Sequence, residues 1–258
     1  MPPRPGTKHA RKLYDHFENA AKKDIENSIA LARAYLGAYD KAVIVKSKKK
    51  NGGNEDFVKE DKWINGDLSR DVKDRGYMTR SELIRLMDWK LHHGKFRGTL
   101  KGNIKKNSEA SVQNISKATL GIMTVKGPVS RERKKDAIKS FSKLVSVGPA
   151  TASAFLSTMY PTQFAFMSDE PLEAVTGRRK WELNEYLTYN DALADVSKRF
   201  SHKLSVQEIE KALWACGQLG FDATIVDDVD SNGKRKAMDY ANEKGGKRKK
   251  KNEQQSKA

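Results

Sequence analysis

Residues 144–175 read LVSVGPATASAFLSTMYPTQFAFMSDEPLEAV, and most of the information on the fold lies in this stretch. It opens with a tight turn, Val147-Gly148-Pro149-Ala150, between two segments that have helical spacing of apolar residues. The small side chains at 152–154 allow two helices to pack closely. The stretch therefore predicts a pair of helices, over 131–145 and 151–159, joined by a short turn.

The turn also predicts an anion site. Gly148 gives the backbone freedom to turn. The first N–H groups of a helix have no partner within the helix, and the positive end of the helix dipole adds to their attraction for a DNA phosphate. The candidate nucleic-acid-binding residues of the turn are Val147, Gly148, Ala150 and Thr151.

The turn resembles the helix-hairpin-helix motif of DNA-repair proteins, whose usual pattern is Leu-Pro-Gly-Val-Gly-x-x-Thr-Ala. The matching residues here are Leu144, Val147, Gly148, Thr151 and Ala152. Val145 stands where proline is usual, and Ser146 stands where the first glycine is usual. A serine accepts the unusual backbone angle of that position only at some cost in free energy.

The resemblance extends to the glycosylase superfamily built on this hairpin, in which a loop leads to a carboxylate at the start of another helix. Asp169, 21 positions after Gly148, takes the place of this catalytic aspartate. Such a carboxylate stabilises positive charge on the sugar as the N-glycosidic bond breaks, and it orients the attacking water. Members that also cut the backbone carry a lysine at the position of Ala150, so the resemblance implies a single-function glycosylase that needs no cofactor.

A non-catalytic interpretation stays open for the same residues. Acids before Pro171, namely Asp169 and Glu170, are also ordinary capping features of a first helical turn, and Glu170 is interpreted as a cap. A retained fold need not retain its activity. The function predicted first is therefore a DNA-binding protein resembling base-excision glycosylases. The alternative is a non-catalytic module that binds nucleic acid or chromatin on the same fold, and a third is a ribosome-biogenesis factor.

Charge supports a polyanionic partner. The 258 residues hold 50 Lys and Arg against 33 Asp and Glu, a net charge of +17. Residues 232–258 carry +7 of it with almost no apolar side chains, so we expect this tail to be disordered. The remaining +10 favours phosphate backbones, of DNA or RNA. No lipidation motif or basic amphipathic anchor favours a membrane instead.

The tail holds two basic clusters that resemble a bipartite nuclear-import signal. They are Lys234, Arg235 and Lys236, and then Lys247, Arg248, Lys249, Lys250 and Lys251. They predict a nuclear location and an import receptor as partner, and the alternative is a solvated tail. The N-terminus shows no signal peptide.

Further basic candidates flank the hairpin. Lys95 and Arg97 belong to a basic stretch over 85–106, and Arg131 and Lys134 begin the first hairpin helix, where cations oppose the dipole. We name all four as candidate phosphate contacts. No metal site is expected, because Cys216 is the only cysteine and the His92-His93 pair lacks a third ligand.

The fold class predicted is all-α. Helical spacing covers 9–39, 79–91, 108–123 and 205–219, with capping boxes at Thr79 and Ser205, a loop over 46–54, and Gly94 and Gly98 ending the helix at 79–91. The expected organisation is a disordered 1–7, a helical glycosylase-like domain over 8–228, a disordered tail over 229–258, and a monomeric state. No apolar run reaches the length of a membrane span.

Overall fold

The computed structural model describes residues 4–21, 24–49, 55–94 and 97–228, and within these ranges every regular element is a helix, so the all-α prediction is confirmed. The elements are α1 (Pro5–Asn19), α2 (Ile25–Gly37), α3 (Tyr39–Lys48), α4 (Glu55–Asn65), α5 (Asp67–Arg75), α6 (Arg80–His93), α7 (Gly98–Ile104), α8 (Glu109–Thr124), α9 (Arg131–Phe141), α10 (Pro149–Met159), α11 (Asp169–Thr176), α12 (Leu183–Arg199), α13 (Val206–Leu219) and the 3-10 helix η2 (Ala223–Asp228).

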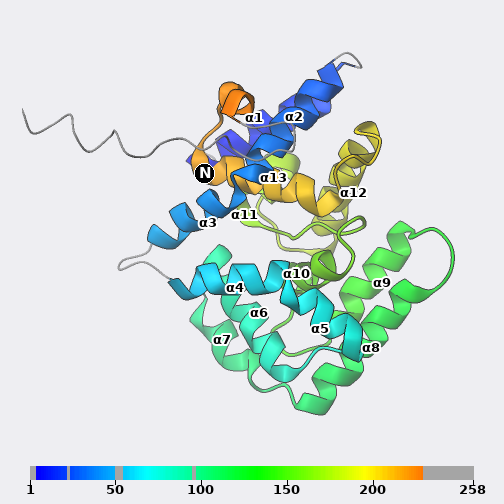
Figure 1. Cartoon of the computed structure of the whole chain (residues 1–258). Coiled ribbons are helices and arrows are strands. Elements are labelled where there is room, and N and C mark those ends of the chain that lie inside the picture. Colours follow the sequence, from blue (N-terminus) through cyan, green and yellow to red (C-terminus); the bar gives the residue numbers. More distant parts are fainter. Residues whose placement is uncertain (1–3, 22–23, 50–54, 95–96, 229–258) are drawn as a thin grey trace, which may run out of the picture.

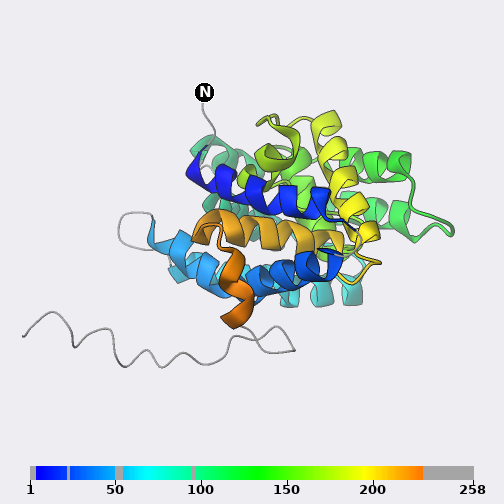
Figure 2. The ribbon, with the colours of Figure 1, turned by 90° about the horizontal axis from the view of Figure 1, so that it is seen from above.

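The helices form two groups that do not follow chain order. The first three helices pack with α11, α12 and α13, while α4 to α10 form a second group beside them (Figure 1). Helix α13 lies between α1 on one side and α2 with α3 on the other (Figure 2). The two ends of the described chain therefore share one half of the molecule.

Aromatic packing joins the two groups. Trp214 of α13 is fully buried, and its ring lies 5.4 Å from Tyr39 of α3 and 4.2 Å from His93 of α6, centroid to centroid. Trp89 of α6 is also buried, and its ring centroid lies 5.0 Å from that of Phe166. Rings of this size bury much apolar area, so α6 is held firmly against the first group.

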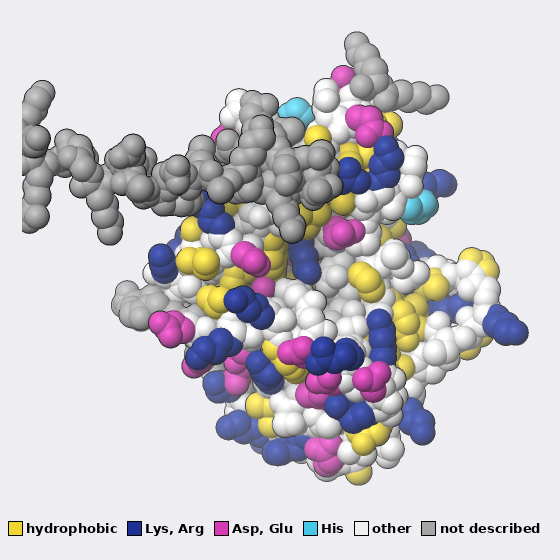
Figure 3. All heavy atoms as spheres, in the orientation of Figure 1, with side chains coloured by type: hydrophobic (Ala, Val, Ile, Leu, Met, Phe, Trp, Pro, Cys, Tyr) yellow, Lys and Arg dark blue, Asp and Glu magenta, His cyan; other side chains and the backbone are white. Residues whose placement is uncertain are grey.

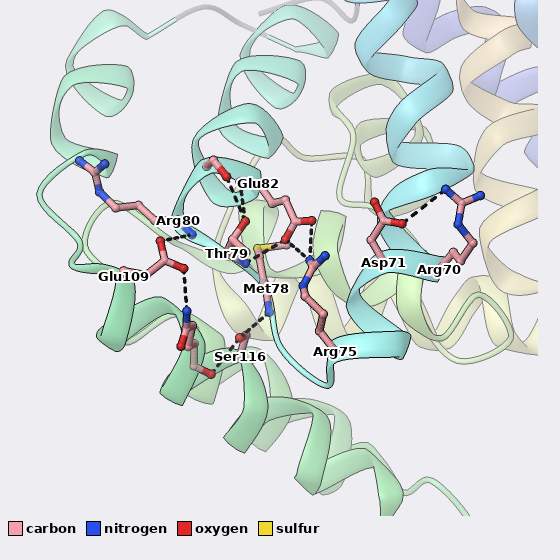
Figure 4. A network of polar contacts seen from close by, with 11 residues as sticks. Arg70, Asp71, Arg75, Met78, Thr79, Arg80, Glu82, Glu109 and Ser116 are labelled. Carbon is pink, nitrogen blue, oxygen red and sulfur yellow. Dashed lines mark hydrogen bonds and ion pairs between the residues drawn. The ribbon is translucent and has the colours of Figure 1, made fainter.

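The start of α6 is fixed by the capping box expected at Thr79. The Thr79 N–H donates to Glu82 at 2.8 Å, and Glu82 also pairs with Arg75 at the end of α5 at 2.6 Å (Figure 4). The Met78 N–H donates to Ser116 of α8 at 2.9 Å. The capping box expected at Ser205 is likewise present at the start of α13.

Three boundaries differ from the sequence-based expectation. Helix α1 begins at Pro5, because proline suits a first helical position and Thr7 is buried, so residues 5–7 are helical rather than disordered. Helix α3 runs to Lys48, and lysines in its last turn complement the dipole, so the predicted loop begins too early. Gly98 begins α7 instead of lying in a loop.

The tail and both import clusters lie outside the described residues, so those predictions are not tested by the fold. Among the described helices, none combines the length and the apolar character that crossing a membrane requires.

Candidate functional site

The predicted helix pair is present as α9 and α10, although α9 ends at Phe141 instead of 145 and α10 begins at Pro149 instead of 151. Phe141 and Phe155 stack between the two helices with centroids 4.4 Å apart, and both side chains are fully buried. Residues 142–148 form the turn, and Ser146 has φ of +62°. The serine thus adopts a left-handed conformation, which glycine adopts at lower cost. Gly148 itself is extended, with φ of −107°.

A side chain that sequence reasoning missed holds this turn in place. Asn107 is 5% exposed, and its amide group donates to the Val145 carbonyl at 3.1 Å while its oxygen accepts from the Val145 N–H at 2.8 Å. The same amide also donates to the Ile104 carbonyl at 2.8 Å. The paired bonds to Val145 imitate a short piece of β-ladder, so the turn has a fixed shape.

The backbone amides near the start of α10 are not equivalent. The Gly148 carbonyl accepts from the N–H groups of Thr151 and Ala152, both at 3.0 Å, and the Thr151 side chain is 2% exposed. Pro149 has no N–H, so Ala150 carries the first helical amide, and no carbonyl lies one turn back to accept it. Of the predicted turn residues, Gly148 and Ala150 therefore suit an anion better than Thr151.

Exposed cations flank the turn. Lys143 lies within it, and Lys106 precedes Asn107 directly; both side chains are exposed. On the face drawn in Figure 3, cations and acids are intermixed. The turn with Lys106 and Lys143 is called the hairpin surface below.

The loop from α10 to α11 is tied to helices on both sides. The Ser153 hydroxyl of α10 accepts from the Met167 N–H at 3.0 Å. Asn190 of α12 accepts from the Ala165 N–H at 2.8 Å and donates to the Gln163 carbonyl at 2.9 Å. These bonds fix where α11 begins, and hence where Asp169 lies relative to the hairpin.

Asp169 and the hairpin line the same small cavity. The carboxylate is 8% exposed and accepts from the Trp181 indole N–H at 3.1 Å. It also lies close to Gly94 at the end of α6, because a Cβ added there would be 3.7 Å from both carboxylate oxygens. The cavity, called the Asp169 cavity below, measures about 20 Å³ and is lined by Lys90, His93, Gly94, Arg97, Ala150, Phe166, Met167, Ser168, Asp169 and Trp181.

Two cations face this cavity. Burial and the nearby Arg97 guanidinium lower the pKa of Lys90 to about 8, although the Asp169 carboxylate opposes the shift. Arg97 lies over the Trp181 ring, 4.6 Å from its centroid. Burial also lowers the pKa of His93 well below its ordinary value, so this side chain is neutral near pH 7.

A second buried acid lies beneath the cavity. Glu210 of α13 accepts a short hydrogen bond from the Ser168 hydroxyl, and burial raises the pKa of Glu210 to about 8. The carboxyl group therefore keeps its proton near pH 7. Its role is to hold Ser168, the residue that precedes Asp169.

Glu170 was expected to cap α11, but no side-chain cap hydrogen bond is present at the start of this helix. Its side chain is 8% exposed and points away from Asp169, toward the place where the backbones of Gly6 and Gly217 meet. A Cβ added to Gly6 would lie 2.8 Å from the Gly217 carbonyl oxygen and 3.3 Å from Glu170 Cγ. Asp169 does not pair with Arg178 either, since that guanidinium lies 3.7 Å from Glu185.

The predicted phosphate contacts have different outcomes. Arg97 lies at the Asp169 cavity. Arg131 pairs instead with Asp191 of α12, and Lys134 is 8% exposed on the same side, with Asp195 nearby. These acids explain the cations at the start of α9 without a phosphate, and a side chain as buried as Lys134 cannot reach one. The Lys95 position lies outside the described residues.

Within the described part of the chain, no three His, Cys, Asp or Glu side chains gather as metal ligands. His93 packs among aromatic rings, and the nearest acid to His92 is Glu60, with Nδ1 and Oε2 3.6 Å apart.

Comparison with known proteins gives no match: no protein-family model, curated protein or solved structure is significantly similar to the chain.

Proposed function

We propose that this protein binds DNA through the hairpin surface and removes a base by hydrolysis, with Asp169 as the catalytic carboxylate. The observation that carries the proposal is that Asp169 and Ala150, the first residue of α10 with an N–H, line one cavity. A phosphate bound at the turn would hold the neighbouring nucleotide beside the carboxylate. The proposal includes a nuclear location, on the strength of the two basic clusters in the tail.

The chemistry follows from the surroundings of Asp169. An ionised carboxylate stabilises the positive charge that develops on the sugar when the N-glycosidic bond breaks. Lys90 and Arg97 supply positive charge beside it, and the Trp181 N–H holds one of its oxygens, so the carboxylate has a fixed direction. The second oxygen is left to orient a water.

The size of the cavity sets a condition on this activity. About 20 Å³ holds roughly one water molecule, which is far smaller than a base. Arg97 and Trp181 stack on each other at the cavity, so a base enters only when this pair separates. A nucleotide extruded from the duplex would push Arg97 and Trp181 apart as it enters the cavity.

The first experiment measures binding. Full-length protein is titrated into a labelled duplex at several salt concentrations, and we expect the affinity to fall steeply with salt because phosphate contacts release counterions. Lys106→Gln together with Lys143→Gln should weaken binding roughly tenfold and reduce the salt slope, whereas Lys41→Gln with Lys48→Gln on α3, both exposed, serves as a charge-matched control. Equal effects of the two double variants would contradict binding at the hairpin surface.

The second experiment separates catalysis from binding. Duplexes with single damaged bases are incubated with the wild-type protein and with Asp169→Asn, and free base is measured. We expect release by the wild-type protein and a loss of roughly a hundredfold in the variant, with unchanged affinity. Binding without any release would favour the non-catalytic module, which the small cavity supports; equal release by both proteins would remove Asp169 from the mechanism.

A further inference from the structure

Lys90 is a lysine for which the fold gives no structural partner. It is on the last turn of α6, and its side chain reaches the Asp169 cavity. Within the described part of the chain no ion pair holds its ammonium group, unlike Lys101 on the neighbouring helix, which pairs with Asp88 at 3.0 Å. Lys90 is partly buried, and a cation that is partly removed from water without an ion pair is costly to keep, which is typical of groups with a chemical role.

Ala150 has no amine that could act as a nucleophile. The glycosylases that the hairpin resembles cut the DNA backbone with a lysine at this position, and this chain has only a methyl group there. Yet Ala150 and Lys90 line the same cavity, from α10 and α6 respectively. The cavity therefore contains an amine, supplied by a different helix.

We infer that Lys90 is a nucleophile that forms an imine with the aldehyde of an abasic site in DNA, in the same cavity as Asp169. The inference rests on the DNA binding proposed above, but not on base removal. Several cavity features agree with it. Burial and Arg97 lower the pKa of Lys90 to about 8, which leaves part of the amine uncharged near neutral pH. An abasic sugar also carries no base, and only its C1′ and C2′ need to reach Nζ and Asp169, so it requires less room than a damaged nucleotide.

The reaction balances without an oxidant or reductant. The Nζ lone pair attacks C1′ of the ring-opened sugar, and the carbinolamine that forms loses water to give the iminium ion. Asp169 then accepts a proton from C2′, the electron pair forms the C2′–C3′ double bond, and the C3′–O bond breaks with the phosphate as leaving group. Water hydrolyses the iminium and restores the Lys90 amine.

Borohydride trapping tests the inference directly. Full-length protein is mixed with a duplex that holds one natural abasic site, and sodium borohydride reduces any imine to a stable secondary amine. Peptide mapping of the adduct should place the sugar on Lys90. A duplex with a tetrahydrofuran site, which has no aldehyde, should bind equally well and give no adduct.

Variants provide the second readout. Lys90→Arg keeps the charge but removes the nucleophile, so we expect at least a tenfold loss of adduct with tetrahydrofuran-duplex affinity within threefold of wild type. Lys90→Met repeats the test without the larger guanidinium. Lys46→Arg is the matched control, because Lys46 is also partly buried, with a pKa lowered chiefly by burial and with Asp169 and Glu170 nearby.

The pH dependence gives a third readout. Arg97 and Asp169 are the charged groups that face Lys90, and His93 beside them is neutral. Adduct formation should therefore rise with pH around 8, where half of the amine is uncharged, and level off above that pH. A rate still rising at pH 10 would assign the adduct to an ordinary lysine.

The outcomes are distinguishable. An adduct mapped elsewhere, full trapping by both Lys90 variants, or tight binding of the abasic duplex without any adduct would each overturn the role of Lys90. Failure to bind either duplex would instead overturn the DNA binding on which the inference rests.

Discussion

Two hollows in the molecule differ in size and in chemistry. The larger one, about 660 Å³, lies between the end of α1, the start of α2 and η2, and is lined by residues such as His16, Asn27, Ala30 and Leu31. The Asp169 cavity holds only about 20 Å³, but an acid, two cations and an indole N–H meet in it. We call the larger hollow the α1–α2 groove. Volume alone would select the groove, whereas convergence of reactive groups selects the cavity.

The groove and the Asp169 cavity also differ in how firmly their walls are held. The groove is bordered by partly exposed side chains at helix ends. The cavity is built from three helices, α6, α10 and α11, and the three loops that follow them. Hydrogen bonds that involve Ser153, Asn190 and Trp181 fix its walls. Reactive groups act well only when their positions are fixed, so the rigid small site is the better candidate.

The largest effect is expected from filling each hollow with the same side chain. Ala150→Leu places three extra carbons between the hairpin turn and Asp169, and we expect adduct formation at abasic sites to fall roughly a hundredfold. Ala30→Leu in the α1–α2 groove should leave it within twofold. Melting temperatures of both variants show that the proteins are folded at the assay temperature. If both variants lose activity equally, the cavity has no special place in the chemistry.

A smaller effect is expected from loosening the turn. Asn107→Ala removes both hydrogen bonds to Val145 and the one to Ile104, and buried bonds of this kind stabilise by ~1 kcal/mol each. Urea unfolding should show a loss of about 3 kcal/mol, and DNA affinity should fall several-fold. Asn27→Ala at the groove should change stability by less than ~0.5 kcal/mol. Equal losses in the two variants would show that Asn107 does not hold the turn.

The smallest effect concerns the backbone of Ser146. Glycine adopts the left-handed conformation without the steric cost that serine bears, so Ser146→Gly should stabilise the protein by about 1 kcal/mol or slightly less. Ser201→Gly is the control, because Ser201 has φ of +51° beyond the end of α12, far along the chain from the hairpin. Both variants should gain stability, and DNA affinity should stay unchanged. A loss of affinity in Ser146→Gly alone would mean that the serine hydroxyl contacts the ligand.

Local signals in the sequence predicted well where they were strong. The capping boxes at Thr79 and Ser205 were confirmed because their hydrogen bonds join residues only three positions apart. The helices α4, α5 and α12 were not predicted, and neither were α3 and α7. Helices α4 and α5 are short and mostly charged. Their few apolar residues, such as Phe57 and Leu68, are recognised as core residues only from their burial in the structure.

The site was less predictable because its contacts are not local. Ala150 at the start of α10 and Asp169 belong to one continuous stretch, and both line the Asp169 cavity, whereas its lining includes no residue of the turn over 142–148. Lys90 and Trp181 come from other parts of the chain, so no spacing rule connects them with Asp169. The same limit explains Arg131 and Lys134, since the sequence alone cannot show that Asp191 and Asp195 of α12 face them.

The packing of α1 against α13 has a consequence for synthesis. A ribosome releases α1 before α11 and α13, yet these two later helices build the surface that covers its apolar face, including Leu13 and Phe17. Helix α11, which begins with Asp169, contacts α1, α12 and α13 as well, so its final position requires nearly the whole described chain. During translation the apolar face of α1 therefore stays uncovered until α11 and α13 are made. The Asp169 cavity reaches its final form only after α13 packs against α11.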